Sequence, residues 1–250
     1  MNDKKQRYGR MKKKYKILGI IPARGGSRRI YKKNIKLLAG KPLIAYAIDV
    51  ASRTSKIDQC IVSTNDKQIA KIAKKWGGYV PFMRPAFLAK DSTPDHPVLI
   101  HAIRQLQKTD GYLPEIIVML RPTSPLKTPA IINNAVKKLI ENPRYTSVRT
   151  VCKAGGVFHP YWMFRNKKGT LFSFIKGVDI VKYYQRQLLP ECFRINGVVD
   201  VLRTSVILNS DNPYGNKVGF LEIDPYNAID IDQKMDFKLC EFLIKTRKKR

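Results

Sequence analysis

The run KILGIIP at residues 16–22, followed at once by ARGGSRR at residues 23–29, decides the fold. After its first lysine the run is apolar throughout, which is typical of a buried strand in a parallel sheet. Adjacent glycines and arginines do not extend such a strand, so a loop begins there and continues to Gly40. Ligands of open α/β sheets bind beyond the carboxyl ends of the strands. The loop after this first strand is therefore the first place to expect functional residues.

The same alternation of strand and helix patterns continues along the chain. Further strands are predicted at residues 59–64, 79–82, 115–120, 147–152, 194–202, 219–223 and 229–232. Helices are predicted to begin at Pro42 and after the capping residue Asp66, and to cover residues 96–106, 129–140 and 236–244. Strands that alternate with helices form an open, mostly parallel sheet with helices on both faces. The predicted fold class is therefore α/β.

The 250 residues contain no repeat and no linker long enough to divide them, although this length allows one large domain or two small ones. We expect a single domain over residues 16–244, with basic tails at residues 1–15 and 245–250. The regular pattern fades after Cys152. Two aromatic- and glycine-rich stretches, GGVFHPYWMF and GTLFSF, predict a hairpin excursion over about residues 153–190.

The charge of the chain indicates which classes of partner to expect. With 48 Lys and Arg against 19 Asp and Glu, the net charge is +29. Such a field favours nucleic acid, an acidic membrane or a phosphorylated small molecule, and a solvated lysine-rich surface is the alternative. The apolar run at residues 17–21 is too short to span a membrane. The scattered cysteines and histidines lack zinc-site spacing, and free thiols fit a cytoplasmic protein.

The loop after the first strand has the composition of a phosphate-binding loop. Gly25 and Gly26 let backbone N–H groups turn towards an anion. Arg24, Arg28 and Lys33 supply charge-assisted hydrogen bonds to phosphate oxygens. A triphosphate suits this loop, although it lacks both the Walker A ending and the dinucleotide fingerprint. A flexible basic loop without a ligand is the alternative.

Two acids near the C-terminus, Asp230 and Asp232, form a candidate metal site. Side chains two residues apart in a strand point the same way about 7 Å apart, so both carboxylates would bracket a Mg²⁺ ion bound to phosphates. The alternative is that Asp232 caps the next helix and Asp230 is exposed. Arg121 begins RPTSP, which follows the most hydrophobic strand and must face the same crevice. The Asn-Gly pair at residues 196–197 is first of all a hairpin-turn signal.

Several motifs occur in the order seen in acylneuraminate cytidylyltransferases, the CMP-sialic acid synthetase family: IIPARGGSRRIYKKNI, GKPLI, IVSTND, RPAFLAKD, LRPTSPL, HPYW, RQLLPECFRINGVVDV and AIDIDQKMDF. The resemblance covers about residues 17–244. It implies a Rossmann-like nucleotidyltransferase fold, a homodimer, and a reaction that joins CTP to a nine-carbon 2-keto-3-deoxy acid and releases pyrophosphate. The HPYW segment resembles the arm that reaches across the dimer in this family.

The resemblance also implies roles for individual residues. CTP would be held by Arg24, Gly25, Gly26, Ser27, Arg28, Lys33 and Asn34, with Arg84 beside the nucleotide. The sugar acid would contact Arg121, Arg186, Gln187, Phe193, Arg194, Asn196 and Asp200. Mg²⁺ would be bound by Asp230 and Asp232, and catalysis would depend on Lys33, Arg24 and Asp232.

Four positions depart from the family pattern: Arg28 replaces the usual Lys, Tyr31 a Pro, Arg121 a Gln and Asp200 a Tyr. The last two bring a new cation and a new anion to the sugar pocket, which suggests an acid other than N-acetylneuraminate, such as legionaminate or pseudaminate. The competing class is a nucleic-acid-binding protein, whose affinity would fall steeply with salt. A sugar binder without catalysis is disfavoured because both candidate metal ligands are retained.

Overall fold

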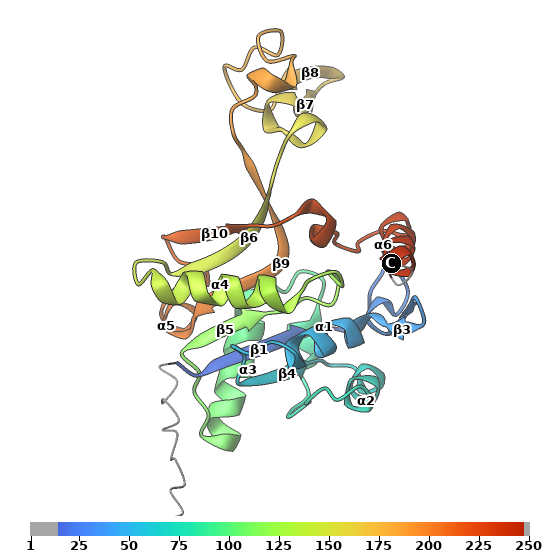
Figure 1. Cartoon of the computed structure of the whole chain (residues 1–250), viewed down its shortest axis with the longest axis vertical. Helices are drawn as coiled ribbons and strands as arrows, with labels where there is room; N and C mark the ends of the chain where they lie inside the picture. Colours follow the sequence, from blue (N-terminus) through green and yellow to red (C-terminus); the bar gives the residue numbers. More distant parts are fainter. Residues whose placement is uncertain (1–14, 248–250) are drawn as a thin grey trace, which may run out of the picture.

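The computed structural model describes residues 15–247, so nearly all of the predicted N-terminal basic tail and half of the C-terminal one lie outside the described residues. Its centre is a six-stranded sheet in the order β10-β6-β9-β5-β1-β4 (Figure 1). β1 pairs in parallel with β4 and β5, and β10 pairs in parallel with β6. β9 runs antiparallel between β5 and β6. The mostly parallel sheet is confirmed, and its strands are Ile17–Pro22 (β1), Gln59–Ser63 (β4), Ile116–Met119 (β5), Ser147–Lys153 (β6), Phe193–Arg203 (β9) and Val218–Glu222 (β10).

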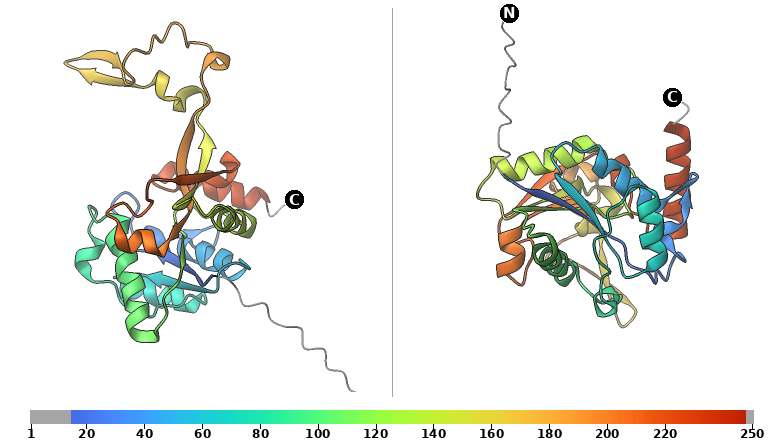
Figure 2. Two further views of the ribbon diagram at one scale, coloured as in Figure 1. Left: turned by 90° about the vertical axis from the view of Figure 1, so that its left-hand side faces the viewer. Right: turned by 90° about the horizontal axis from the view of Figure 1, so that it is seen from below.

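Helices cover both faces of the sheet, as predicted (Figure 2). Residues of α1 (Leu43–Ser52), α2 (Lys67–Lys75) and α4 (Pro129–Glu141) share one buried apolar cluster with alternate residues of β1 and β5. The other residues of these two strands face a second cluster with α3 (Asp95–Asp110) and α5 (Thr204–Asn209). Burial on both faces explains why these strands are apolar without interruption.

Two further elements surround the loop after β1. A short hairpin joins β2 (Leu37–Leu38) to β3 (Lys41–Pro42). Its two turn residues, Ala39 and Gly40, both have positive φ, 47° and 83°, as a type I′ turn requires. The C-terminal helix α6 (Lys234–Arg247) packs through Phe237 and Cys240 in the same apolar cluster as Ile30. The last helix of the chain therefore supports the loop that follows its first strand.

The capping signals of α2 were identified correctly. The Asp66 side chain accepts hydrogen bonds from the backbone N–H groups of Gln68 and Ile69, which satisfies two donors at the start of the helix. Gly77 follows the helix with φ of 81°. Among residues 15–247, no helix combines the length and apolar character needed to cross a bilayer.

Residues 154–192 leave the sheet between β6 and β9 and extend well away from it (Figures 1 and 2). They contain an antiparallel hairpin formed by β7 (Phe164–Lys167) and β8 (Thr170–Ser173). Leu171, Phe172 and Phe174 are exposed here. Exposed apolar side chains are therefore concentrated on this excursion, away from the buried clusters of the sheet.

Two strand predictions were wrong. Residues 79–82 form only isolated bridges at Tyr79 and nearby Met83, because Pro81 between them has no N–H to donate. Residues 229–232 are not a strand either: the Ile231 N–H donates to the Thr123 carbonyl at 2.8 Å. The next two N–H groups, of residues 232 and 233, both donate to the Asp236 carboxylate. An acid in the first turn that reaches back in this way caps α6, so the segment ends in a helix cap.

The Asn-Gly pair at residues 196–197 is not a hairpin turn. It lies within β9, where the pairing with β6 changes register. Gly197 has φ of 67°, which a β-bulge accommodates readily at a glycine. The signal for a positive φ was correct, and the element that uses it is a bulge.

Candidate active site

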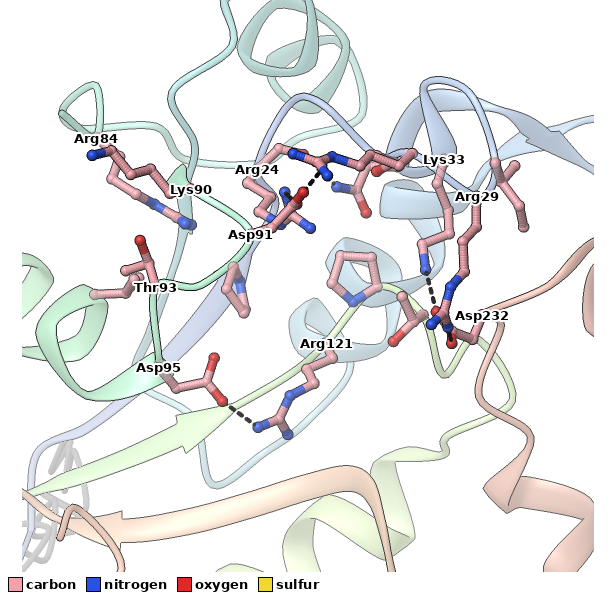
Figure 3. A pocket seen from close by; sticks show the side chains of 18 of the residues that line it. Arg24, Arg29, Lys33, Arg84, Lys90, Asp91, Thr93, Asp95, Arg121 and Asp232 are labelled. Carbon is pink, nitrogen blue, oxygen red and sulfur yellow. Dashed lines mark hydrogen bonds and ion pairs between the residues drawn. The ribbon is translucent and has the colours of Figure 1, made fainter. Parts of the chain in front are cut away.

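A cavity of about 540 Å³ lies beyond the carboxyl ends of β1 and β5, where open α/β sheets bind ligands (Figure 3). Four segments far apart in the sequence form its walls. These segments are the loop after β1, residues 84–98, the start of the loop after β5, and the region of Asp232. The residues that line it are Pro22, Arg24, Ser27, Arg28, Arg29, Ile30, Lys33, Asn34, Arg84, Leu88, Lys90, Asp91, Thr93, Asp95, Val98, Arg121, Pro122, Thr123 and Asp232.

The loop after β1 is held in place by specific hydrogen bonds. The Gly25 N–H donates to the Asn65 side chain at 2.9 Å, and the Asn34 amide donates to the Arg24 carbonyl at 2.9 Å. A Cβ atom on Gly25 would lie 2.9 Å from the Asp66 carboxylate, which excludes larger residues. The Gly25 N–H is therefore not free to bind an anion, contrary to our prediction. The alternative of a flexible loop is also disfavoured, because both ends of this turn are anchored.

Lys33 and the 230–232 segment share this cavity although about 200 residues separate them. The Lys33 Nζ donates to the Ile231 carbonyl at 2.8 Å and lies 3.7 Å from Oδ1 of Asp232. Burial lowers the pKa of Lys33; Asp230 opposes this effect, and Arg24 and Arg29 add to it. The structure thus brings the cationic loop together with Asp232, one of the two distant acids.

The two acids differ in their placement. Asp232 lines the cavity and forms an ion pair with Arg29. Asp230 is exposed and does not line the cavity, yet it lies close enough to affect the pKa of both Lys33 and Lys127. Because residues 229–232 are not a strand, the alternation that we used to align the two carboxylates does not apply. Within residues 15–247, no group of three or more Asp, Glu, His or Cys side chains is arranged to hold a metal alone.

An acid that the sequence analysis missed, Asp91, lies against the basic loop. It forms ion pairs with both Arg24 and Arg28. Asp91 is the last residue of the RPAFLAKD motif, so the sequence indicated that it lies near the loop. The sequence did not indicate which residues it contacts. A triphosphate that binds these arginines competes with Asp91 only for Nη1 of Arg24 and Nε of Arg28, because the ion pairs use one nitrogen of each guanidinium.

Arg84 is a buried cation with a positioning role. Its guanidinium donates to the Ser63 hydroxyl and carbonyl and to the Leu88 carbonyl. Burial lowers the pKa of Arg84 to about 10, and the nearby Asp95 carboxylate opposes this effect. These contacts fix the segment after residue 84 against the end of β4, so Arg84 contributes shape as well as charge to the cavity.

Arg121 and Asp200 form one ion pair rather than two separate charges in the pocket. The Arg121 Nη1 donates to Asp200 at 2.7 Å and Nη2 donates to Asp95 at 2.7 Å. Asp200 has no exposed side-chain surface and also accepts from Arg149 at 2.9 Å. Asp200 therefore lies behind Arg121 and does not line the cavity. Asp95 and Arg149 had no role in the sequence analysis, because nothing local in the sequence links them to residue 121.

Lys127, also missed, holds the loop after β5 from beneath. Its ammonium group is buried and donates to the carbonyls of Arg121 (2.7 Å) and Ser124. Burial, with a smaller contribution from Arg121 and against the effect of Asp230, lowers the pKa of Lys127 to about 7. The ordinary value is 10.5, so the folded protein disfavours the proton on this group.

The low pKa of Lys127 predicts a dependence of stability on pH. Between pH 7 and 10.5 the unfolded chain binds a proton at this group that the folded chain does not. The free energy of unfolding therefore rises with pH in this window, by up to about 1.4 kcal/mol per pH unit from this group. Lys127→Met removes the contribution. Urea unfolding at pH 7, 8 and 9 should show a stability difference between wild type and variant that grows in favour of the wild type; parallel curves contradict the assignment.

The remaining predicted sugar-site residues do not line this cavity. Arg186 lines a second cavity of about 360 Å³ at the base of the excursion, together with Lys153, His159 and Glu191. Asn196 is buried, and its amide bonds to Thr150, Cys152 and Val198 within the chain. The other three, Gln187, Phe193 and Arg194, belong to the excursion or to the start of β9, and no polar contact links them to the cavity lining. Their contact with a sugar acid remains a prediction.

Comparisons with known proteins agree with this geometry. The chain is 31% identical over 231 residues to the CMP-N,N'-diacetyllegionaminic acid synthase of Legionella pneumophila, a match that covers 92% of this chain and 96% of that protein. It is 30% identical over 232 residues to the post-translational flagellin modification protein B of Campylobacter coli, with the same coverage of 92% and 96%.

A solved structure of CMP:2-keto-3-deoxy-manno-octonic acid synthetase complexed with CTP superposes with a TM-score of 0.68 over 93% of this chain and 99% of that one. At 15% identity this likeness establishes the shared fold. The family model described as cytidylyltransferase matches residues 18–208. The family inferred from the motifs is confirmed, and the chain belongs to the cytidylyltransferases.

Proposed function

We propose that this protein transfers the cytidylyl group of CTP to a nonulosonic acid and releases pyrophosphate. One observation supports this above all: the anchored basic loop, with Lys33, shares a cavity with an acid from the far end of the chain. The new bond joins the anomeric hydroxyl oxygen of the acid to the α-phosphorus. The bond between this phosphorus and the oxygen that bridges to the β-phosphorus breaks, and the hydroxyl proton is released.

The residues of the cavity act by positioning and by charge. Arg24 and Arg28 bind phosphate oxygens through guanidinium N–H groups that do not contact Asp91, and Lys33 stabilises the charge that develops on departing pyrophosphate. Asp232, the only acid of the C-terminal pair that lines the cavity, accepts the proton of the attacking hydroxyl. Catalysis then requires no covalent intermediate on the protein.

The donors present fit a Mg²⁺ ion. Asp230 and Asp232 supply two carboxylates, too few to enclose an ion but typical of Mg²⁺, which takes its other ligands from substrate phosphates and water. When bound, Mg²⁺ would neutralise phosphate charge and lower the pKa of the attacking hydroxyl. Of the two oxygens of Asp232, Oδ2 pairs with Arg29 and Oδ1 lies 3.7 Å from the Lys33 ammonium group.

The excursion supports a homodimer in which each active site takes residues from both chains. Arg186, Gln187 and Arg194 lie on or beside a projection that carries exposed apolar side chains, away from the sheet of its own chain (Figure 2). In a two-fold dimer the same surface of each chain contacts the other. The excursion of one chain then delivers these residues to the cavity of the other.

Mixing two inactive variants tests the shared site. Lys33→Ala damages the cavity and Arg194→Ala damages the start of β9, where the excursion returns to the sheet, so neither pure variant should turn over at a useful rate. In a mixed dimer, one site combines the intact cavity of one chain with the intact excursion of the other. Refolding the two variants together at equal ratio should restore about a quarter of the wild-type rate, because about half of the dimers are mixed and each has one intact site. No recovery would place Arg194 in the same chain as its cavity.

The function itself is tested by CTP-dependent pyrophosphate release with a panel of nonulosonic acids. An acid other than N-acetylneuraminate, with a legionaminate or a pseudaminate as candidates, is supported by a relative's name, CMP-N,N'-diacetyllegionaminic acid synthase, and by the departure at Arg121, which lines the cavity. The departure at Asp200 acts only through Arg121, because Asp200 is buried behind it. A clear preference for N-acetylneuraminate rejects the finer assignment. The four free cysteines suit the cytoplasm, where CTP is made. The competing function, nucleic-acid binding, predicts that affinity for nucleic acid falls steeply as the salt concentration rises and that no pyrophosphate is released from CTP.

A further inference from the structure

Asp95 presents a carboxylate to the cavity at the start of α3. Its side chain is 42% exposed, and Figure 3 shows it directed towards Arg121, away from Lys33 and Asp232. Among the described residues, hydrogen bonds reach only its Oδ2, which accepts from Arg121 at 2.7 Å. The second oxygen, Oδ1, is thus available to a ligand.

A line of alternating charges holds this carboxylate in position. Arg149 donates to Asp200 at 2.9 Å, Asp200 accepts from Arg121 at 2.7 Å, and Arg121 donates to Asp95. The Arg149 guanidinium also lies 3.9 Å from the centre of the Tyr214 ring. Bonds between a planar guanidinium and two carboxylates fix direction as well as distance. Rotation of Asp95 away from Arg121 would break one end of this line.

The same line removes Arg121 as an anion receptor. Both of its terminal nitrogens already donate to carboxylates, and Nη1 also donates to the Gly197 carbonyl at 3.2 Å. The four side chains carry two positive and two negative charges, so the line itself has no net charge. An anionic group of a substrate gains little from Arg121 and meets the Asp95 carboxylate. A neutral hydrogen-bond donor is the group that fits.

Both substrates of the proposed reaction carry such donors as hydroxyl groups. Asp95, Arg121 and Arg84 line the same cavity, and the charge of Asp95 acts on both arginines. This position is at the junction of the nucleotide and the sugar acid if Arg84 is beside the nucleotide. Acidic side chains bind ribose hydroxyls in other nucleotide sites for the same reason.

We propose that Asp95 accepts a hydrogen bond from a hydroxyl group of a bound polyol, either the CTP ribose or the sugar acid, and that Arg121, Asp200 and Arg149 position it. This inference rests on the proposed function. It makes Asp95 a specificity-determining residue and the three residues behind it positioning residues.

Asp95→Asn is the sharpest test, because it keeps the shape and reverses the polarity. The Asn oxygen still accepts from Arg121, and an NH₂ group then replaces Oδ1 in the cavity. One arm of the experiment compares kcat/KM for CTP, 2′-deoxy-CTP and 3′-deoxy-CTP. The other compares nonulosonic acids that lack one hydroxyl each. The wild type should discriminate against one of these analogues by roughly 10- to 100-fold, and the variant should lose that discrimination.

The control is Asp91→Asn, a second cavity acid of similar exposure that faces Arg24 and Arg28. It should change the KM for all three nucleotides alike and leave the discrimination intact. If Asp95→Asn keeps every preference of the wild type, the inference is overturned. If the wild type releases no pyrophosphate with any acid, the proposed function fails, while the nucleotide arm is still decided by calorimetric binding of CTP and its deoxy analogues.

Asp200→Asn tests the positioning line separately. Asp200 is fully buried and touches no substrate, so a purely structural role would lower stability and turnover for all substrates in proportion. A positioning role instead lowers the discrimination that Asp95 provides, at temperatures where the variant remains folded. An unchanged ratio of kcat/KM between the natural substrate and the discriminated analogue rejects this part of the inference.

Discussion

Replacing Asp232 with Asn should lower turnover by roughly 100- to 10,000-fold while the protein remains folded. Asp232 lines the cavity and contacts Arg29, and its carboxylate lies 3.7 Å from the Lys33 ammonium group. The Asn side chain keeps the size but has no charge for a metal ion and no basicity for the hydroxyl proton. Its side chain is 51% exposed, so the lost ion pair should change the free energy of unfolding by about 1 kcal/mol or less. Pyrophosphate release at saturating CTP, together with a thermal melt, measures both quantities.

Asp224→Asn provides the matched control for this prediction. Asp224 lies in the same C-terminal region, is exposed, and its side chain accepts from the Tyr226 N–H, which an Asn side chain also does. It does not line the cavity, so its turnover should equal that of the wild type. Raising the Mg²⁺ concentration should partly restore Asp232→Asn if the carboxylate is a metal ligand. Undiminished activity of Asp232→Asn removes both the metal and the proton-acceptor assignments.

The fold was largely predictable because its main signals are local. β1 and β5 are apolar at every position, since alternate residues face two different clusters, and Asp66 caps α2 through residues that follow it directly. The direction of β9 was not predictable, because an apolar run reports burial and not orientation. The 229–232 error has the same origin: apolar–acidic alternation suits a strand, but the Ile231 N–H pairs with a loop carbonyl of Thr123.

The site, too, has features that could be predicted from the sequence and features that could not. The basic loop after β1 could be predicted from composition and position alone. Its acidic partner Asp91 could not, because the pairing with Arg24 depends on how two loops fold over one edge of the sheet. Arg121 and Asp200 were both singled out, but as independent charges; that they neutralise each other follows only from the antiparallel pairing of β5 with β9, which places Asp200 opposite Met119.

Lys33→Met should lower kcat by about 100- to 1,000-fold, as expected when a charge that stabilises a developing anion is removed. The Lys33 side chain is only 16% exposed. Its ammonium group donates to the Ile231 carbonyl and lies beside Asp232 in the cavity. Met is similar in length to Lys and can fill the space that the Lys33 side chain occupies. Because burial lowers the pKa of Lys33, its charge is unfavourable to the folded state, so the variant should be no less stable than the wild type. Stopped-flow pyrophosphate release and urea unfolding separate the two effects.

Lys32→Met is the control, since it removes one positive charge from the neighbouring residue. Lys32 is exposed, donates to the Gln68 side chain at 2.8 Å and does not line the cavity, so its turnover should be close to that of the wild type. If the turnover of Lys33→Met falls no further than that of this control, net charge rather than position explains the effect and the assignment of Lys33 is wrong.

The dependence of the rate on pH tests the role of Lys33 independently. The ammonium form is the active one, so the rate should fall as pH rises through the pKa of Lys33, which burial places below its ordinary value of 10.5. Lys33→Arg should move this alkaline decline to higher pH, because the guanidinium keeps its proton, although its planar fork fits less well beside the Ile231 carbonyl and lowers the maximal rate.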